Sequence, residues 1–292
     1  MTVPGWIDEI AWPADGPPWL AMGLARIQEA AWLLPDGHRD AELAQRGALL
    51  DQSPGEVFAA LPGTEAASAE VLAMVRSWEH DHGPDLAGRP IDRSQHPLEA
   101  AGRRTQEDLV LMVPHADGHH LDAAVLCFPS HWRLADKVGG SATAIHAPVP
   151  GYEVELAEKV DRFLDRLRPG VIVARRNWSV HGDAELHAPV PPADPVPVAV
   201  DEVARSLWLR SERQTLRRLP DSGAVLFTIR VQQAPFAAFA AFPEAAVRLA
   251  DRLDAQPDEL TAMNGLAPHR GAAVDWLRRV AETPSAQGSA SP

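Results

Sequence analysis

The spacing of apolar residues predicts helices near both ends of the chain. Between Glu65 and Trp78, apolar side chains recur every three or four residues, as on the buried side of an amphipathic helix. A weaker pattern of the same period covers residues 40–50. Pro243–Leu253 and Gly271–Ala281 predict two further helices after the middle of the chain.

The middle of the chain has the pattern of β-strands. Short apolar runs, Asp108–Val113 and Leu121–Phe128, flank a turn at Gly118 and predict a hairpin. Pro129 ends the second run, and Ser130 is placed to cap a short helical stretch. A helical stripe from Tyr152 to Leu167 follows. Three more strands are predicted, at Val171–Val180, Leu207–Leu219 and Ala224–Val231.

The order strand, strand, helices, strand, strand, strand predicts an α+β fold: an antiparallel sheet with helices packed on one face, plus N-terminal and C-terminal helical extensions. We divide the chain into an N-terminal helical extension (1–95), a sheet-bearing core (96–235), C-terminal helices (236–282) and a Ser/Ala/Gly/Pro-rich tail (283–292). The composition of the tail is typical of disorder.

Composition narrows the classes of partner. The net charge of −13 over 292 residues disfavours nucleic acid and anionic lipid, because both bind clustered Lys and Arg. The N-terminus has the pattern of neither a signal peptide nor a membrane span, so we expect a cytoplasmic protein. The one cysteine, Cys127, lies in an apolar run and is expected to be a buried, inert thiol. It cannot supply the ligands of an iron–sulfur cluster or a cysteine-rich zinc site.

Charged residues interrupt strands that should be central. In Leu207–Leu219 neither face is cleanly apolar, and in Val171–Val180 the residues Arg175 and Asn177 share a face with two valines. One interpretation is a solvated or helical segment. The alternative is an anion, since the arginine fork suits carboxylates and phosphates and a buried charge needs a partner. The arginines concerned are Arg175, Arg176, Arg210, Arg213, Arg217, Arg218 and Arg230.

The histidines leave a similar choice open. His119 and His120 fall at the predicted turn, where we expect them to be solvated, and His115 and His131 flank strand ends. His146 and His187 each stand two residues before a proline that restrains the backbone. No spacing typical of a zinc pair is present, whereas an axial ligand to heme iron needs no spacing motif. Motifs for dinucleotides, P-loops and the serine-hydrolase elbow are also missing from the sequence.

Six short stretches together resemble the heme-dependent oxidative N-demethylase family. They are Met22-Gly23-Leu24, Phe128-Pro129-Ser130-His131-Trp132, Ile145-His146-Ala147-Pro148-Val149-Pro150-Gly151-Tyr152, Arg176-Asn177-Trp178-Ser179, Leu186-His187-Ala188-Pro189 and the most specific, Leu209-Arg210-Ser211-Glu212-Arg213-Gln214-Thr215-Leu216-Arg217-Arg218-Leu219-Pro220. The resemblance implies a heme b in a PAS-like fold and the oxidative removal of an N-methyl group from a small amine such as dimethylamine. It also implies O₂ as co-substrate and electrons from a separate reductase subunit with flavin and iron–sulfur centres.

The resemblance also gives expectations for individual residues. His146 is expected to be the axial iron ligand, with His187 as the alternative, and Arg175, Arg210 and Arg213 would pair with heme propionates. Asn177 and Trp178 would contact the cofactor. Glu212, with Arg210 on the same strand face, would hold a cationic amine or manage its proton, unless it forms a structural salt bridge to a neighbouring arginine. A heme-based sensor, and a silent or non-heme binding subunit of the same fold, remain alternatives.

Overall fold

The computed structural model describes residues 5–7, 22–83, 90–192, 196–263 and 265–282. At its centre lies a seven-stranded sheet in the order β1-β5-β6-β7-β3-β4-β2, and every neighbouring pair is antiparallel. The strands are β1 (Ala25–Ile27), β2 (Phe58–Ala60), β3 (Asp108–His115), β4 (Gly118–Val125), β5 (Ile172–His181), β6 (Trp208–Arg218) and β7 (Val225–Pro235). The predicted hairpin and the three later strands are therefore confirmed.

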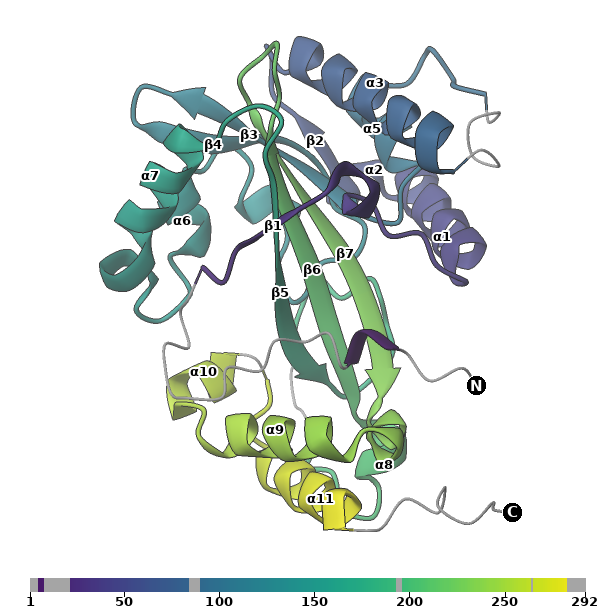
Figure 1. Ribbon diagram of the computed structural model, residues 1–292, viewed down its shortest axis with the longest axis vertical. Coiled ribbons are helices and arrows are strands. Elements are labelled where there is room, and N and C mark those ends of the chain that lie inside the picture. The colour runs from purple at the N-terminus through teal and green to yellow at the C-terminus, as the bar shows by residue number, and fades with distance from the viewer. Residues whose placement is uncertain (1–4, 8–21, 84–89, 193–195, 264, 283–292) are drawn as a thin grey trace.

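The helices form three groups around the long strands β5, β6 and β7 (Figure 1). The group at one end contains α1 (Arg39–Gln52), α2 (Pro54–Val57), α3 (Glu65–His82) and α5 (Pro97–Gly102). The group beside the sheet contains α6 (Ala142–His146), a π-helical turn η4 (Glu153–Ala157) and α7 (Glu158–Arg166). The group at the opposite end contains α8 (Val203–Ser206), α9 (Pro243–Asp254), α10 (Asp258–Met263) and α11 (Arg270–Glu282).

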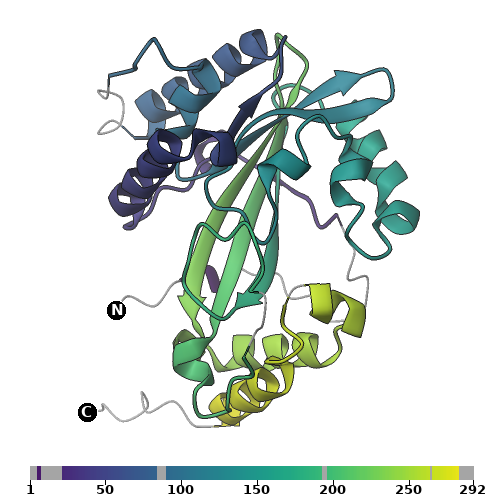
Figure 2. The ribbon, with the colours of Figure 1, turned by 180° about the vertical axis from the view of Figure 1, so that it is seen from behind.

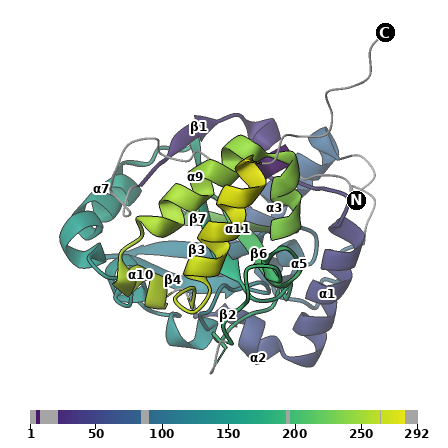
Figure 3. The ribbon, with the colours of Figure 1, turned by 90° about the horizontal axis from the view of Figure 1, so that it is seen from below.

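The helices that follow β7, predicted as a C-terminal extension, lie apart from the helices that follow β4. Figure 3 shows α9 and α11 at the end of the long strands, whereas α7 lies at the side. Because β5, β6 and β7 are long and twisted, their two ends are served by separate apolar clusters. The first cluster joins α3, α5 and α7 to β3 and β4, and the second joins α8, α9 and α11 to the far ends of β5, β6 and β7.

The N-terminal region does more than extend the fold with helices. It also supplies β1 and β2, which form the two edges of the sheet by pairing with β5 and β4. Three-residue strands of this kind carry too little pattern to be recognised in a sequence. The tail predicted at 283–292 lies outside the described residues, and none of the described helices is long and apolar enough to cross a membrane.

The predicted burial of the one cysteine is confirmed. Cys127 is fully buried beyond β4, and burial raises the pKa of its thiol to about 11. Its backbone N–H donates to the buried carboxylate of Asp108, which is paired with Arg46 at 2.7 Å.

Candidate functional site

The two faces of β5, β6 and β7 carry different sets of side chains. Direct cross-strand neighbours share a face, and the register pairs Arg175 with Gln214, Asn177 with Glu212, and Ser179 with Arg210. We call the side that includes these residues the site face. The other side, the anchor face, contains Arg176, Trp178, Arg213, Arg217 and Arg230. The predicted residues Arg213 and Trp178 therefore do not lie with Arg175, Asn177 and Glu212.

Arginines on the anchor face hold the protein's own N-terminal segment. Arg213 donates to the carbonyls of Trp32 and Ala31, and Arg217 pairs with Glu29 over the Trp32 ring. This segment includes η2 (Glu29–Ala31), which crosses in front of the long strands in Figure 1. The structure thus gives Arg213 a role in holding the chain together and not in pairing with a propionate.

The third of these arginines is the most buried. Arg230 is 0% exposed, pairs with Asp36 at 2.7 Å and with Glu42 at 2.8 Å, and donates to the carbonyl of Leu34. It stands directly opposite Arg213 across the strands. Two like charges in that position repel unless each has its own partners, and here each has.

Arg210 lies on the site face, but its guanidinium is saturated by the protein. It is 0% exposed and donates to Ser130 Oγ and to the carbonyls of Phe128, Pro129, Glu185 and Leu186. These bonds tie the segment after β4 to the segment after β5, and both lie on the side of the sheet seen in Figure 2. With these N–H groups bonded to its own chain, Arg210 has a positioning role.

Glu212 is half-buried next to these hydrogen bonds of Arg210. Its carboxylate accepts a hydrogen bond from Ser130 Oγ, and Gln214 Nε2 donates to its second oxygen at 3.0 Å. Within the described residues no arginine forms a salt bridge with it. Ser130 therefore connects Arg210 to Glu212. The prediction that it caps the next helical stretch is wrong, because the 3₁₀ helix Leu134–Asp136 begins after Arg133 without a side-chain cap. Asn177, directly across from Glu212, is exposed.

Arg175 and Tyr152 are the exceptions among the polar groups of this region. Arg175 is half-buried, and within the described part of the chain its guanidinium has no hydrogen bond or ion pair. Burial lowers its pKa, and the charge of Glu212 offsets this only in part. Among the described residues the buried Tyr152 hydroxyl has no hydrogen-bond partner, and burial, with Asp161 nearby, raises its pKa to about 12.

His146 is the last residue of helix α6 and lies next to these groups. Its ring stacks on Tyr152 with 4.4 Å between ring centroids and 10° between planes. Its Nδ1 lies 2.7 Å from the carbonyl of Ala142 one helical turn earlier, so Nδ1–H donates and Nε2 keeps its lone pair. Burial lowers the pKa of His146, although the Ala142 carbonyl opposes this shift; Lys137 and Arg175 lower it further. A neutral imidazole with this anchor is the form that binds a metal.

His187 has the same kind of anchor on the other segment. Its Nδ1 lies 2.8 Å from the carbonyl of Cys127, which also leaves Nε2 unprotonated. It is half-buried beside Leu186, to which Arg210 donates. The two histidines therefore share one feature of a ligand, but only His146 lies next to the unpaired Arg175 and Tyr152.

The residues of the site face fit a heme. A macrocycle with two carboxylates would supply the anionic partner that Arg175 lacks and an acceptor for the Tyr152 hydroxyl. His146 offers a neutral nitrogen for the iron, and Phe227, Ile229 and Leu216 give the same face an apolar portion. Sequence reasoning missed Tyr152 and Ser130; both stand inside the stretches that carry the resemblance, which was the available signal.

A pocket with three histidines adjoins the end of the site face. It has a volume of about 240 Å³ and is lined in part by His131, His181 and His269. The rings of His131 and His181 stack at 4.4 Å, and burial lowers the pKa of all three histidines, that of His181 to about 3. The backbone of His131 has a φ of 60°, in the left-handed region that residues other than glycine rarely adopt. Its backbone N–H donates to Ala188, which fixes it beside the His187 segment.

A protein-family model described as haem-dependent oxidative N-demethylase, alpha subunit-like, matches residues 80–274. The match covers more than half of the chain. The chain belongs to this family. The matched region includes α6, the three long strands and every residue of the site face named above. The family's description specifies a heme-dependent oxidative enzyme, and the words alpha subunit indicate an assembly of more than one kind of subunit.

Proposed function

We propose that this chain is the heme b subunit that removes an N-methyl group from a small amine such as dimethylamine, with O₂ and with electrons from a separate flavin and iron–sulfur reductase. The observation that carries the proposal is that Arg175 and the Tyr152 hydroxyl lie beside the neutral His146 and have no hydrogen-bond partner among the described residues. Family membership supports the same reaction class. The PAS-like description of residues 96–235 and the cytoplasmic location belong to this proposal.

His146 would hold the heme iron through Nε2, because Ala142 fixes Nδ1–H and Tyr152 fixes the ring plane. His187 is the second choice for the same task. Arg175 would pair with a propionate, and the Tyr152 hydroxyl would donate to it. When bound, heme supplies the activation of O₂ that lets the N-methyl carbon be oxidised.

Glu212 would bind the substrate's ammonium group. A half-buried carboxylate that forms no salt bridge within the described residues attracts a cation, and the exposed Asn177 amide across the strand offers a further polar contact. The Ser130 hydroxyl between Glu212 and Arg210 would fix the carboxylate's direction.

Glu212 can also move the proton that the reaction requires. One dimethylamine, one O₂, two electrons and two protons give methylamine, formaldehyde and water. In the last step the hydroxylated methyl carbon loses its bond to nitrogen. Glu212 would take the proton from the hydroxyl oxygen and return it to the nitrogen of the departing amine.

The electrons would come from outside this chain. With one buried cysteine it cannot ligate a cysteine-bound iron–sulfur cluster, and it has no dinucleotide motif. An alpha subunit that binds heme therefore needs a reductase partner.

An absorption spectrum of the purified full chain, oxidised and after dithionite, tests the heme assignment. We expect a Soret band that His146→Ala abolishes or shifts. His82→Ala is the matched control, because His82 also contacts the carbonyl four residues earlier, Trp78, and stacks on its ring. An unchanged band in His146→Ala with a lost band in His187→Ala would transfer the ligand role to His187.

Formaldehyde release from dimethylamine tests the reaction. We expect Glu212→Gln to keep the Soret band and lose at least about 100-fold in turnover, the scale of general acid–base catalysis. A chain with normal heme that releases no formaldehyde with a competent electron donor would favour the sensor or silent-subunit alternatives.

A further inference from the structure

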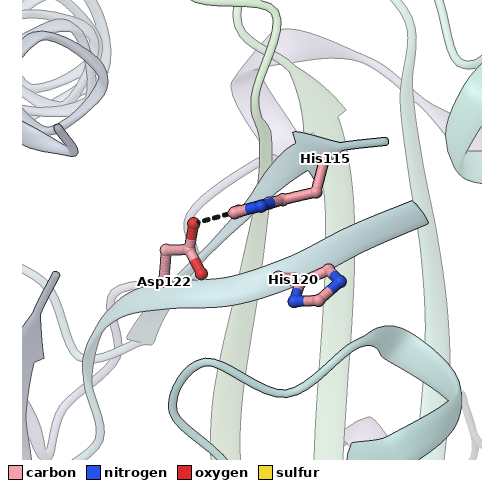
Figure 4. A group of neighbouring side chains, drawn as sticks. All are labelled: His115, His120 and Asp122. Carbon is pink, nitrogen blue, oxygen red and sulfur yellow. Dashed lines mark hydrogen bonds and ion pairs between the residues drawn. The ribbon is translucent and has the colours of Figure 1, made fainter. Parts of the chain in front are cut away.

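A second group of polar side chains lies on the β3–β4 hairpin, away from the site face. His115, His120 and Asp122 each offer one ligand atom, and these atoms lie within 4.8 Å of one another (Figure 4). His115 Nε2 lies 2.6 Å from Asp122 Oδ2, and the His115 and His120 rings are 4.4 Å apart. Two imidazoles and a carboxylate are ligands that Zn²⁺ and related divalent ions accept.

The pairing of β3 with β4 brings these residues together. Val113 pairs with His120, which puts His115 and His120 on one face of the two strands. Between Leu111 and Met112 the register shifts by one residue, so Asp122 has no cross-strand partner. Asp122 is two residues from His120 on β4, the spacing at which side chains of a strand share a face.

His120 has an oxygen acceptor at each of its ring nitrogens. Its Nδ1 lies 3.0 Å from the carbonyl of Gly139, and its Nε2 lies 3.0 Å from Asp117 Oδ1. Both ring nitrogens thus face oxygen acceptors, whereas a neutral imidazole has one N–H. If Nδ1–H donates to Gly139, the Nε2 lone pair faces a carboxylate, which is favourable with a proton or a metal ion between them.

We propose that His115, His120 and Asp122 bind one divalent transition-metal ion, with Zn²⁺ as the reference ion. The Gly139 carbonyl fixes the ring of His120 in the manner usual for a metal-bound histidine. Asp117, exposed at the hairpin turn, can supply a fourth ligand, or water can. Neighbouring ligand atoms in a tetrahedral site are about 3.3 Å apart, so the exposed His115 ring has to move by less than about 1 Å from Asp122.

Such an ion would secure more than the hairpin. Gly139 N–H donates to Leu121, Leu121 N–H donates to Gly140, and His120 forms a bridge with Ser141, the residue that caps α6. The ion would therefore fix the segment that leads into the helix of His146. Its expected effect is a higher unfolding temperature, which is measurable without any activity.

The test uses the full chain with its heme bound. Divalent metal ions are first removed with EDTA, and Zn²⁺ binding is then measured by titration calorimetry. We expect about one equivalent to bind and the unfolding temperature to rise. His115→Ala, at an exposed position, and Asp122→Asn, which keeps the shape of the side chain, should each weaken binding by more than about 10-fold and remove the rise. The Soret band should stay unchanged in both variants, which separates this site from the proposed heme site.

His80→Ala is the matched control. His80 lies 3.0 Å from Asp81 at an exposed position, without a second histidine, so its loss should leave the Zn²⁺ affinity unchanged. Absorption bands of Co²⁺ in place of Zn²⁺ would report the ligand geometry. No Zn²⁺ binding by the unmodified chain, or equal affinity in all three variants, would overturn the proposal.

Discussion

The two faces of the long strands both carry arginines, but these arginines differ in whether the protein itself supplies their hydrogen-bond and ion-pair partners. On the anchor face Arg213, Arg217 and Arg230 are held by carbonyls and carboxylates of residues 29–42. On the site face Arg175 has no such partner within the described residues, and the hydroxyl of Tyr152 beside it has none either.

The difference teaches which charges serve the fold and which await a ligand. A buried guanidinium with all its N–H groups bonded to its own chain is part of the architecture. A guanidinium whose pKa is lowered by burial, and which has no acceptor on the described part of its own chain, indicates a binding site for an anionic ligand. By this criterion Arg210 belongs with the anchor arginines although it lies on the site face.

The largest effect is expected on the anchor face. Arg230→Met should lower the free energy of unfolding by about 3–5 kcal/mol, because Asp36 and Glu42 lose the buried cation that both pair with. Urea denaturation measures this. Arg248→Met, which breaks an exposed pair with Glu244, is the control and should cost about 1 kcal/mol or less. The amount of heme bound per folded molecule should not change. If it fell along with the stability, the two faces would not have separate roles.

Arg210→Lys should cost about 3 kcal/mol of stability and also reduce turnover. A lysine keeps the charge but cannot reach the carbonyls of Phe128, Glu185 and Leu186 together. Ser130 then loses its donor, and the direction of Glu212 loosens. Urea denaturation and formaldehyde per heme measure the two losses. A variant with normal turnover would show that the hydrogen bonds of Arg210 do not position Glu212.

Arg175→Met should behave in the opposite way. Its removal takes away a half-buried charge without a partner, so the heme-free protein should be as stable as the unmodified protein or more so. Heme affinity should fall by about 10- to 100-fold, since a charge-assisted hydrogen bond is worth about 1.5–3 kcal/mol. Hemin titration measures this. Unchanged affinity together with lost stability would assign Arg175 to the fold.

His181 gives the site face a stability that depends on pH. Burial, then the charges of Arg210 and His131, lower its pKa from 6.5 to about 3, while Ser179 Oγ lies 3.0 Å from its Nε2. Between these values the unfolded chain binds the proton and the folded chain does not. Stability therefore falls as the pH drops from about 6.5 towards 3, and His181 accounts for about 2 kcal/mol of the loss by pH 5.

His181→Gln should make the free energy of unfolding fall less steeply over that range. Urea denaturation at pH 5 and pH 8 measures the slope. His80→Gln, at an exposed position, is the control and should not alter it. An equal slope in both variants would mean that His181 takes up its proton in the folded state as readily as in the unfolded state.

Much of the architecture could be predicted because it follows local periods. The alternation in β3 and β4 and the helical stripes of α3 and α7 arise from residues a few positions apart, and the structure has them where expected. The edge strands β1 and β2 could not be predicted, since three residues carry no period.

The candidate site divides in the same way. The sequence by itself determined that arginines interrupt central strands and that His146 and His187 stand at restrained positions. Only the tertiary structure decided which arginines are saturated, because Arg213 meets the carbonyl of a residue 181 positions away and Arg210 meets segments on two different loops. A hydrogen bond between distant residues leaves no local pattern, and so the missing partner of Arg175 became visible once the chain had folded around it.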